Sequence, residues 1–188
     1  VVLPKVTDIA HVHALDLLLT QLEKAGGLEV GRIGIDAQIE DARGLTLVDA
    51  IAAHPRVHAL VLGPADLMAS LNMRTLVVGE QPDGYDVGDA YHHVLMTILV
   101  AARANGVAAV DGPYLKVRDV DAFRAVASRS AALGYDGMAR SDAVAADLLG
   151  VAAETITTDG ITFSGGGKSV TYLDLITECW KRKTSMAH

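Results

Sequence analysis

The sequence contains few of the features that mark secreted, membrane or disulfide-stabilised proteins. Its single cysteine, Cys179, excludes an internal disulfide framework and fits a reducing compartment. No apolar run reaches the roughly 18 residues that a membrane-spanning helix needs. The opening segment, Val1–Val6, lacks the basic stretch that begins a secretory signal peptide. We therefore expect a cytoplasmic protein with no membrane partner.

Basic and aromatic residues are also scarce. The chain has 16 Lys and Arg against 23 Asp and Glu, so its formal net charge is −7, which argues against a nucleic-acid partner. Aromatic residues make up 4% of the chain and hydrophobic residues 51%, so the core should be aliphatic. The length of 188 residues suits one domain, or one domain with an appendage.

Short apolar runs alternate with amphipathic stretches along most of the chain. This alternation predicts a parallel sheet with right-handed helical crossovers. No GxGxxG follows the first strand, which disfavours a dinucleotide-binding fold and favours a barrel. The predicted fold is therefore α/β, a TIM (β/α)8-type barrel that is incomplete, with about five parallel β/α units. The strands should begin near residues 1, 32, 57, 107 and 135, and the helices should cover about 11–25, 47–53, 90–105 and 119–133.

The first helix shows the helical spacing most clearly. Asp8 can cap it, and one apolar stripe should face the core. The stripe consists of Val12, Leu15, Leu18, Leu19 and Leu22. The histidines form no metal-ligand pattern, and we expect His54, which lies near a turn, to be a surface residue.

Residues 139–188 differ in character from the residues before them. We predict a partial β/α barrel over 1–138 and a divergent tail over 139–188, in which a helix near 141–149 precedes possible β-hairpins. Asp159-Gly160 and Gly165–Gly167 lie between β-branched runs, which is typical of hairpin turns.

Carboxylates follow four of the five predicted strands. These residues are Glu40 with Asp41, Asp66, Asp111 and Asp136. Because parallel strands end at one edge of a sheet, the carboxylates should gather there and repel one another unless a cation such as Mg²⁺ neutralises them. The alternative is that acidic residues simply favour loops and helix N-termini, and spacing alone does not decide between the two. Lys5 follows the remaining strand, where it either faces the same edge or forms a salt bridge.

Five short motifs, in order, resemble a known family. They are PKV at Pro4–Val6, QIEDARGL at Gln38–Leu45, LVLGPADL at Leu60–Leu67, DGPY at Asp111–Tyr114 and GYDG at Gly134–Gly137. Together they resemble the citrate lyase β-subunit-like branch of the HpcH/HpaI aldolases, which includes malyl-CoA lyase-like CoA-ester lyases. The resemblance covers residues 1 to about 138.

The resemblance implies a Mg²⁺-dependent TIM-barrel enzyme that makes or breaks a carbon–carbon bond. Its substrate would be a 3-hydroxyacyl-CoA such as malyl-CoA or citramalyl-CoA, cleaved to an acyl-CoA and a 2-oxo acid such as glyoxylate. The family's two metal-binding carboxylates fall on Glu40 and Asp66, and the metal would act as a Lewis acid on the oxo acid. A homo-oligomer built from trimers is the expected assembly.

Further site residues are expected around these carboxylates. Backbone N–H groups of the turn formed by Gly63, Pro64, Ala65 and Asp66 are candidate anchors for the substrate carboxylate. Asp111 either reaches the metal's water shell or caps the Asp-Gly-Pro turn. Arg43 is a candidate catalytic residue. It is not the equivalent of the family's substrate-holding Arg, which would lie on a β/α unit that precedes Val1.

Two departures from the family pattern keep other interpretations open. Relatives would begin with two more β/α units, and would carry a His-Pro pair where this chain reads MARSDAVAADLLG after Gly137. A five-stranded piece of a barrel has two unprotected edges. Either the tail covers an edge, or chains associate, or the polypeptide is a fragment. The alternative functions are a truncated, inactive barrel that acts as an assembly partner and a metal-dependent class II pyruvate aldolase.

Overall fold

A computed structural model describes residues 1–75, 78–114, 120–139, 157–158 and 162–171. The strands are β1 (Val2–Leu3), β2 (Ile35–Ile39), β3 (Val57–Leu62), β4 (Ala108–Asp111), β5 (Gly137–Met138), β6 (Thr157–Thr158), β7 (Thr162–Gly165) and β8 (Lys168–Thr171). The helices are α1 (Ile9–Ala25), α2 (Ala42–Thr46), α3 (Val48–Ala52), α4 (Pro64–Ser70), α5 (His92–Asn105) and α6 (Val120–Leu133).

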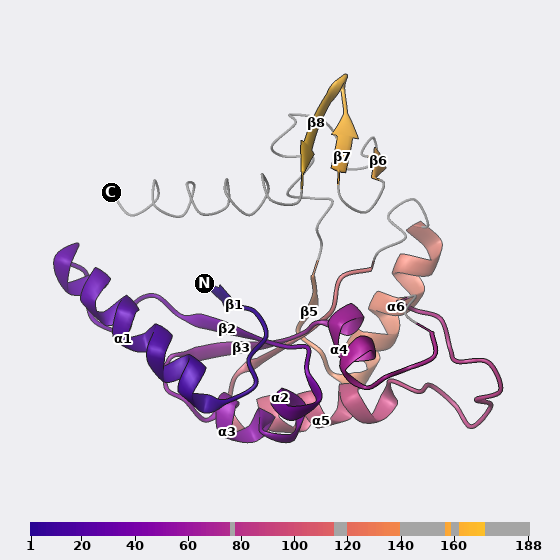
Figure 1. Cartoon of the computed structure of the whole chain (residues 1–188), viewed down its shortest axis with the longest axis horizontal. Coiled ribbons are helices and arrows are strands. Elements are labelled where there is room, and N and C mark those ends of the chain that lie inside the picture. The colour runs from indigo at the N-terminus through magenta and orange to yellow at the C-terminus, as the bar shows by residue number, and fades with distance from the viewer. Residues whose placement is uncertain (76–77, 115–119, 140–156, 159–161, 172–188) are drawn as a thin grey trace. The chain divides into compact units, whose positions relative to one another are not determined.

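The first five strands form one parallel sheet, whose spatial order β1-β2-β3-β4-β5 is also their order in the chain (Figure 1). The predicted alternation of parallel strands and helices is confirmed. The single helix expected over 47–53 is instead α3, preceded by the short α2. The difference arises because the Asp41 side chain accepts the N–H of Arg43 and so starts a helix earlier.

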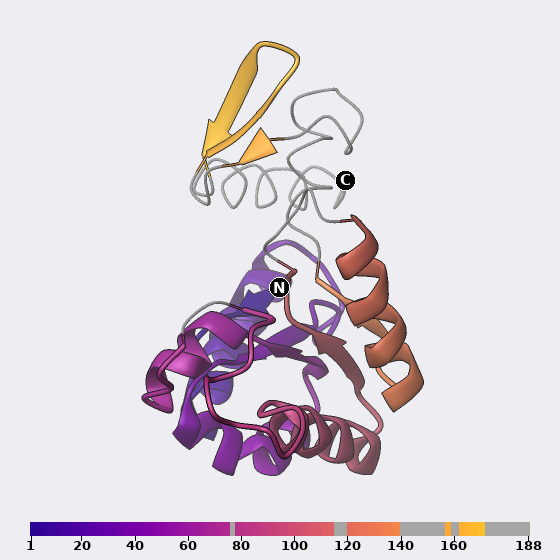
Figure 2. The same cartoon turned by 90° about the vertical axis from the view of Figure 1, so that its right-hand side faces the viewer.

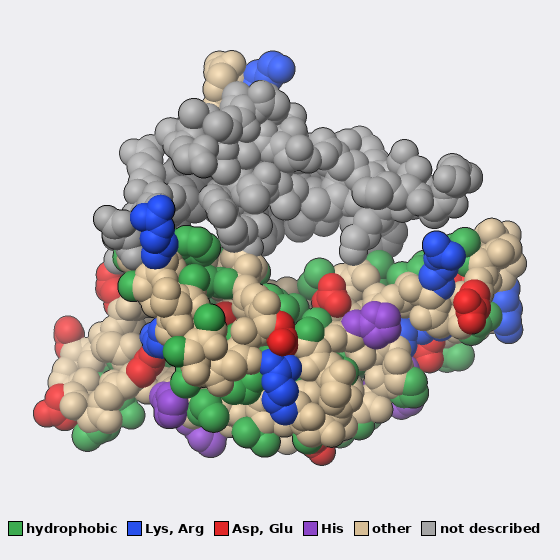
Figure 3. Space-filling model, turned by 180° about the vertical axis from the view of Figure 1, so that it is seen from behind, with side chains coloured by type: hydrophobic (Ala, Val, Ile, Leu, Met, Phe, Trp, Pro, Cys, Tyr) green, Lys and Arg blue, Asp and Glu red, His purple; other side chains and the backbone are tan. Residues whose placement is uncertain are grey.

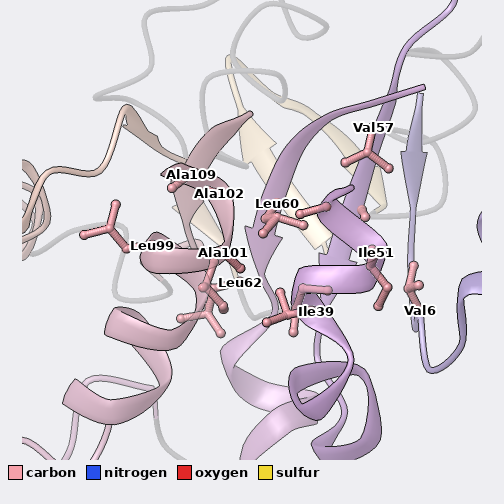
Figure 4. Packing of buried hydrophobic residues seen from close by; sticks show 14 of the residues in the cluster. Val6, Ile39, Ile51, Val57, Leu60, Leu62, Leu99, Ala101, Ala102 and Ala109 are labelled. Carbon is pink, nitrogen blue, oxygen red and sulfur yellow. The ribbon is translucent and has the colours of Figure 1, made fainter. Parts of the chain in front are cut away.

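The core lies between the sheet and helices α3 and α5, which Figures 1 and 2 show on the same side of the strands. Successive side chains of a strand point to opposite faces of the sheet. The pairing of β2, β3 and β4 places Ala37, Leu60 and Ala109 side by side in one buried row. This row packs with Ile51 and Leu99 of the helices (Figure 4). The next row consists of Gln38, Val61 and Val110, which are half-buried on the opposite face.

Helix α1 buries a different stripe from the one predicted. Val12 and Leu19 are buried as expected, whereas Leu18 and Leu22 are more than half exposed. Glu23 takes the buried position because it pairs with Arg56 beneath the helix. Apolar spacing alone could not reveal this, since an acidic residue is assigned to the solvent side of a helix.

Two compact units are present, Val1–Gly112 with Ala127–Ala139 and Pro113–Val126 with Arg140–His188. On the first unit, acidic and basic side chains are dispersed over the face seen in Figure 3. Within the described residues of the second unit, β6, β7 and β8 form an antiparallel sheet. Gly166 and Gly167 connect β7 to β8, and their φ angles of 59° and 75° fit the tight hairpin turn predicted there.

No helix in the described part of the chain is long and apolar enough to cross a bilayer. The helix predicted near residues 141–149 and Cys179 lie outside the described residues.

Candidate metal and substrate site

Glu40 stands directly after β2 and shares a sheet face with Gln38, two residues earlier. The Gln38 side-chain amide donates to Glu40 Oε2 at 2.9 Å, and the Lys5 backbone N–H donates to Oε1 at 2.8 Å. Glu40 is only 6% exposed. Burial and the charge of Asp66 raise its pKa above the ordinary value, although the hydrogen bond from Lys5 opposes this. Glu40 is thus a fixed, buried carboxylate that a nearby cation would help to ionise.

Lys5 reaches both candidate metal-binding residues. It follows β1 with a φ of 52°, in the left-handed region that few residues other than glycine adopt. Its backbone N–H contacts Glu40 and its ammonium forms an ion pair with Asp66 Oδ2. The hydrogen bond from Lys5 to Asp66 raises the pKa of the lysine. The two side chains are 66% and 53% exposed, so this pair lies at the surface.

Gly63 allows the Glu40 carboxylate to approach the turn that carries Asp66. A Cβ on Gly63 would lie 2.4 Å from Glu40 Oε2 and 2.5 Å from Glu40 Cβ, closer than atoms can pack. The Gly63 N–H donates to the carbonyl of Ile39 at 2.9 Å, which joins the ends of β2 and β3. Pro64 follows at the first position of α4, where its fixed φ favours helix initiation. Asp66 therefore lies in the first turn of α4, beside Glu40's strand.

Helix α4 is held at both ends by side-chain hydrogen bonds. The Tyr91 hydroxyl donates to the Pro64 carbonyl at 2.8 Å, and burial raises the Tyr91 pKa to about 12, so it remains a donor. At the other end, the Ser70 hydroxyl donates to Asp41 Oδ2 at 2.9 Å and accepts the Ala42 N–H at 2.9 Å. These contacts fix the position of Asp66 relative to β2 and α2.

The predicted backbone anchors in the Gly63–Leu67 turn are fewer than expected. Pro64 has no N–H, Gly63 donates to Ile39, and Leu67 donates to the Gly63 carbonyl at 3.2 Å. Among the N–H groups of this turn, those of Ala65 and Asp66 are left to meet a substrate carboxylate. Helix α4 itself is only seven residues long.

Arg43 and Asp111 contact other residues than Glu40 and Asp66. The Arg43 guanidinium forms a 3.0 Å ion pair with Asp8, the N-cap residue of α1. Asp111 is buried, and its position in β4 places it with Ala109 on the face covered by helices. Its carboxylate accepts the Gly112 N–H at 2.7 Å and the Ser130 hydroxyl, which fits the turn-capping alternative.

The donor set suits a hard divalent cation. Mg²⁺ is commonly held by one or two carboxylates, with water and substrate oxygens completing its shell. Glu40 and Asp66 provide two such carboxylates, and no group of three or more His, Cys, Asp or Glu ligands occurs among the described residues. The Lys5 ammonium on Asp66 shows that this position accommodates positive charge.

The sequence pattern predicts the two carboxylates at this edge of the sheet but not the groups that hold them. Gln38 lies two residues before Glu40, and residues at this spacing in a strand share a face. That spacing could have indicated the contact between the two side chains. The contact between Tyr91 and Pro64 spans 27 residues and left no local pattern. For Lys5, the sequence leaves open whether it faces this edge or forms a salt bridge, and the structure places it in an ion pair with Asp66.

Comparison with known proteins agrees with the motifs. Residues 1–143 match the model of the family described as HpcH/HpaI aldolase/citrate lyase. The chain belongs to this family. The resemblance seen in the sequence is therefore confirmed.

Individual relatives each match most of the chain. The L-malyl-CoA/beta-methylmalyl-CoA lyase of Rhodobacter capsulatus is 38% identical over 146 residues, which cover 73% of this chain and 46% of the relative. A (3S)-malyl-CoA thioesterase of Cereibacter sphaeroides is 32% identical over 137 residues, which cover 73% of this chain and 41% of the relative. The chain thus spans about half the length of the curated relatives that it matches.

Solved structures support the same assignment. The citrate lyase beta subunit of M. tuberculosis, in complex with oxaloacetate and magnesium, is 29% identical, with a TM-score of 0.58 over 74% of this chain and 54% of that one. A malate synthase of Haloferax volcanii, in a lead(II) complex, is 26% identical, with a TM-score of 0.61 over 74% of this chain and 39% of that one.

Proposed function

We propose that residues 1–138 form part of the TIM barrel of a Mg²⁺-dependent CoA-ester lyase, with Glu40 and Asp66 as the metal ligands. The reaction would cleave a 3-hydroxyacyl-CoA of the malyl-CoA type into an acyl-CoA and a 2-oxo acid, or run in reverse. The observation that carries the proposal is the convergence of Glu40 and Asp66, which follow neighbouring parallel strands, on one cationic residue. This edge is where β/α barrels place their chemistry.

The residues of this chain would position the metal and the oxo acid. When bound, Mg²⁺ supplies a Lewis acid for the oxo group. The Gln38 amide and the Lys5 N–H hold the two Glu40 oxygens in one orientation. The N–H groups of Ala65 and Asp66 are the proposed anchors for the oxo-acid carboxylate.

Arg43 and Asp111 take supporting roles in this proposal. Arg43 links α2 to the start of α1 through Asp8, and Asp111 ties the end of β4 to Ser130 of α6. We infer that two further tasks, recognition of CoA and proton transfer at the acyl carbon, fall to groups outside the described site. These groups would lie beyond the matched region or come from a second copy of the chain. Light scattering coupled to gel filtration tests the homo-oligomer that the second source requires.

Manganese titration tests the metal half of the proposal. Mn²⁺ replaces Mg²⁺ at oxygen sites and is detected by electron paramagnetic resonance. We expect one Mn²⁺ per chain, bound more tightly with glyoxylate, and a loss of binding in Glu40→Gln and Asp66→Asn. The matched controls are Glu29→Gln and Asp83→Asn, which remove exposed carboxylates elsewhere and should leave affinity unchanged. Equal affinity in all five proteins would refute the site.

Hydrolysis of the thioester is a second candidate, favoured by the similarity to the Cereibacter thioesterase. The reaction products distinguish the lyase from the thioesterase. From malyl-CoA, a lyase yields acetyl-CoA and glyoxylate, whereas a thioesterase yields malate and free CoA. Cleavage of a free hydroxy-oxo acid without CoA would instead indicate the class II aldolase alternative.

A further inference from the structure

One residue contacts both proposed metal ligands through different atoms. The Lys5 backbone N–H holds Glu40, and the Lys5 ammonium neutralises Asp66. The left-handed backbone at Lys5 makes this double contact possible, because it turns the chain sharply just after β1. A positive charge is therefore already present at the edge where a divalent cation is expected.

We propose that the Lys5 ammonium is the resident counter-ion of the metal-free site, and that a divalent cation must displace it from Asp66 to bind. This inference rests on the proposed function, since it takes Glu40 and Asp66 as metal ligands. It assigns Lys5 a regulatory effect on metal affinity rather than a role as a ligand.

The balance of charges favours displacement. An exposed Lys–Asp pair is weakly held, because water screens both charges and the long side chain loses freedom in the pair. With two-thirds of its side chain exposed, Lys5 can swing into solvent on its flexible stem. A divalent ion attracts Asp66 with twice the charge of the ammonium and also attracts Glu40. The lysine therefore lowers metal affinity.

Substitutions of Lys5 distinguish competition between its ammonium and the metal from the structural role of its backbone N–H. Lys5→Met removes the competing charge but keeps the backbone N–H bonded to Glu40, so Mn²⁺ affinity should rise by roughly three- to tenfold. Lys5→Arg keeps the charge and should bind Mn²⁺ much as the wild type does. Lys24→Met, an exposed lysine in the last turn of α1, controls for the change in net charge and should alter affinity less than about twofold. Urea midpoints of all variants confirm that each is folded.

Chemical labelling of lysine amines provides a readout that does not depend on the Met variant. Peptide mass spectrometry should show slow acetylation of Lys5 in the metal-free protein. Acetylation should be faster in Asp66→Asn, and faster in the wild type once Mn²⁺ is bound. The rate at Lys24 should be the same in all samples.

The outcomes distinguish failure of this inference from failure of the proposed function. Higher affinity in Lys5→Met together with metal-dependent labelling of Lys5 supports displacement, as does Mn²⁺ binding that appears only in Lys5→Met. Wild-type Mn²⁺ binding with unchanged or lower affinity in Lys5→Met overturns the inference and leaves the metal site standing. Absence of Mn²⁺ binding in both proteins overturns the metal site and the inference with it.

Discussion

The two ends of the parallel sheet both carry ion pairs, but they differ in burial. At the amino ends of β2 and β3, Arg56 and Glu23 have side chains that are 5% and 0% exposed. At the carboxyl ends, the pair of Lys5 and Asp66 is more than half exposed. The comparison shows that the charges at one end are enclosed by the protein, whereas those at the other end meet solvent. The carboxyl ends of the strands are where β/α barrels place their chemistry.

The buried end satisfies its charges with many hydrogen bonds. Arg56 Nη1 donates to both Glu23 oxygens at 2.8 and 2.9 Å, Nη2 donates to Thr20 at 2.8 Å, and Nε pairs with Asp16. Burial raises the pKa of Glu23, but backbone N–H groups of the loop before β2 and the Arg56 guanidinium outweigh it and hold the pKa at about 2. Charges enclosed in this way are costly to unpair.

Breaking the buried cluster should have the largest effect on stability. Arg56→Met leaves the Glu23 carboxylate buried without its partner, so the free energy of unfolding should fall by about 3–5 kcal/mol. Urea denaturation measures the loss. Arg32→Met, an exposed arginine in the loop before β2, serves as the control and should change stability little. Equal losses in the two variants would contradict the role given to burial.

The second-largest loss of stability should come from crowding at the exposed end of the sheet. In Gly63→Ala the new Cβ meets Glu40 Oε2 and Cβ, so the strand ends must shift, at a cost of about 1–3 kcal/mol. Mn²⁺ affinity should fall together with stability, because Glu40 moves. Gly137→Ala adds a Cβ with no atom within 4 Å and is the matched control. A stable Gly63→Ala protein with full affinity would show that Glu40 need not lie against this turn.

A smaller effect should appear as a pH dependence of stability at the buried end. His54 is buried against His13, with ring centroids 4.7 Å apart, and Arg56 and Asp16 also face it. Burial first, and then His13, lower the pKa of His54 below its ordinary value of 6.5, against the opposing effect of Asp16. The folded state therefore binds fewer protons than the unfolded state just below pH 6.5, so stability falls as the pH drops through that range.

His54→Gln tests this origin of the pH dependence. Urea midpoints measured between pH 7.5 and pH 5 should fall less steeply in this variant than in the wild type, whereas the exposed His92→Gln should follow the wild type. Parallel curves for all three proteins would assign the dependence to other groups.

The smallest effect on stability should come from the surface pair. Asp66→Asn removes the partner of Lys5, and exposed pairs of this kind add little to folding. The urea midpoint should match that of the control Asp83→Asn. A clear drop in Asp66→Asn alone would show that the pair stabilises the fold.

The parallel alternation and the acidic edge were predictable from sequence because both are local patterns. Apolar runs between helical stretches indicate the strands. Glu40 directly follows one of them, and Asp66 lies four residues after the end of the next, in the first turn of α4. The buried end was not predictable. His54 was expected at the surface, and this was wrong, because its burial depends on His13, 41 residues away. Likewise, the pairing of Glu23 with Arg56 spans 33 residues, so no local spacing indicates it.

The contrast between the buried and the exposed end of the sheet is tested most directly by one paired measurement. Mn²⁺ affinity and the urea midpoint are determined on the same preparations of Asp66→Asn and Arg56→Lys. Lysine at position 56 keeps the charge but loses the guanidinium geometry, so this variant should remain folded with a lower midpoint. We predict that Asp66→Asn loses Mn²⁺ binding at an unchanged midpoint, and that Arg56→Lys retains full Mn²⁺ affinity at a lower midpoint. Retained Mn²⁺ binding in Asp66→Asn with a lowered midpoint would contradict the account.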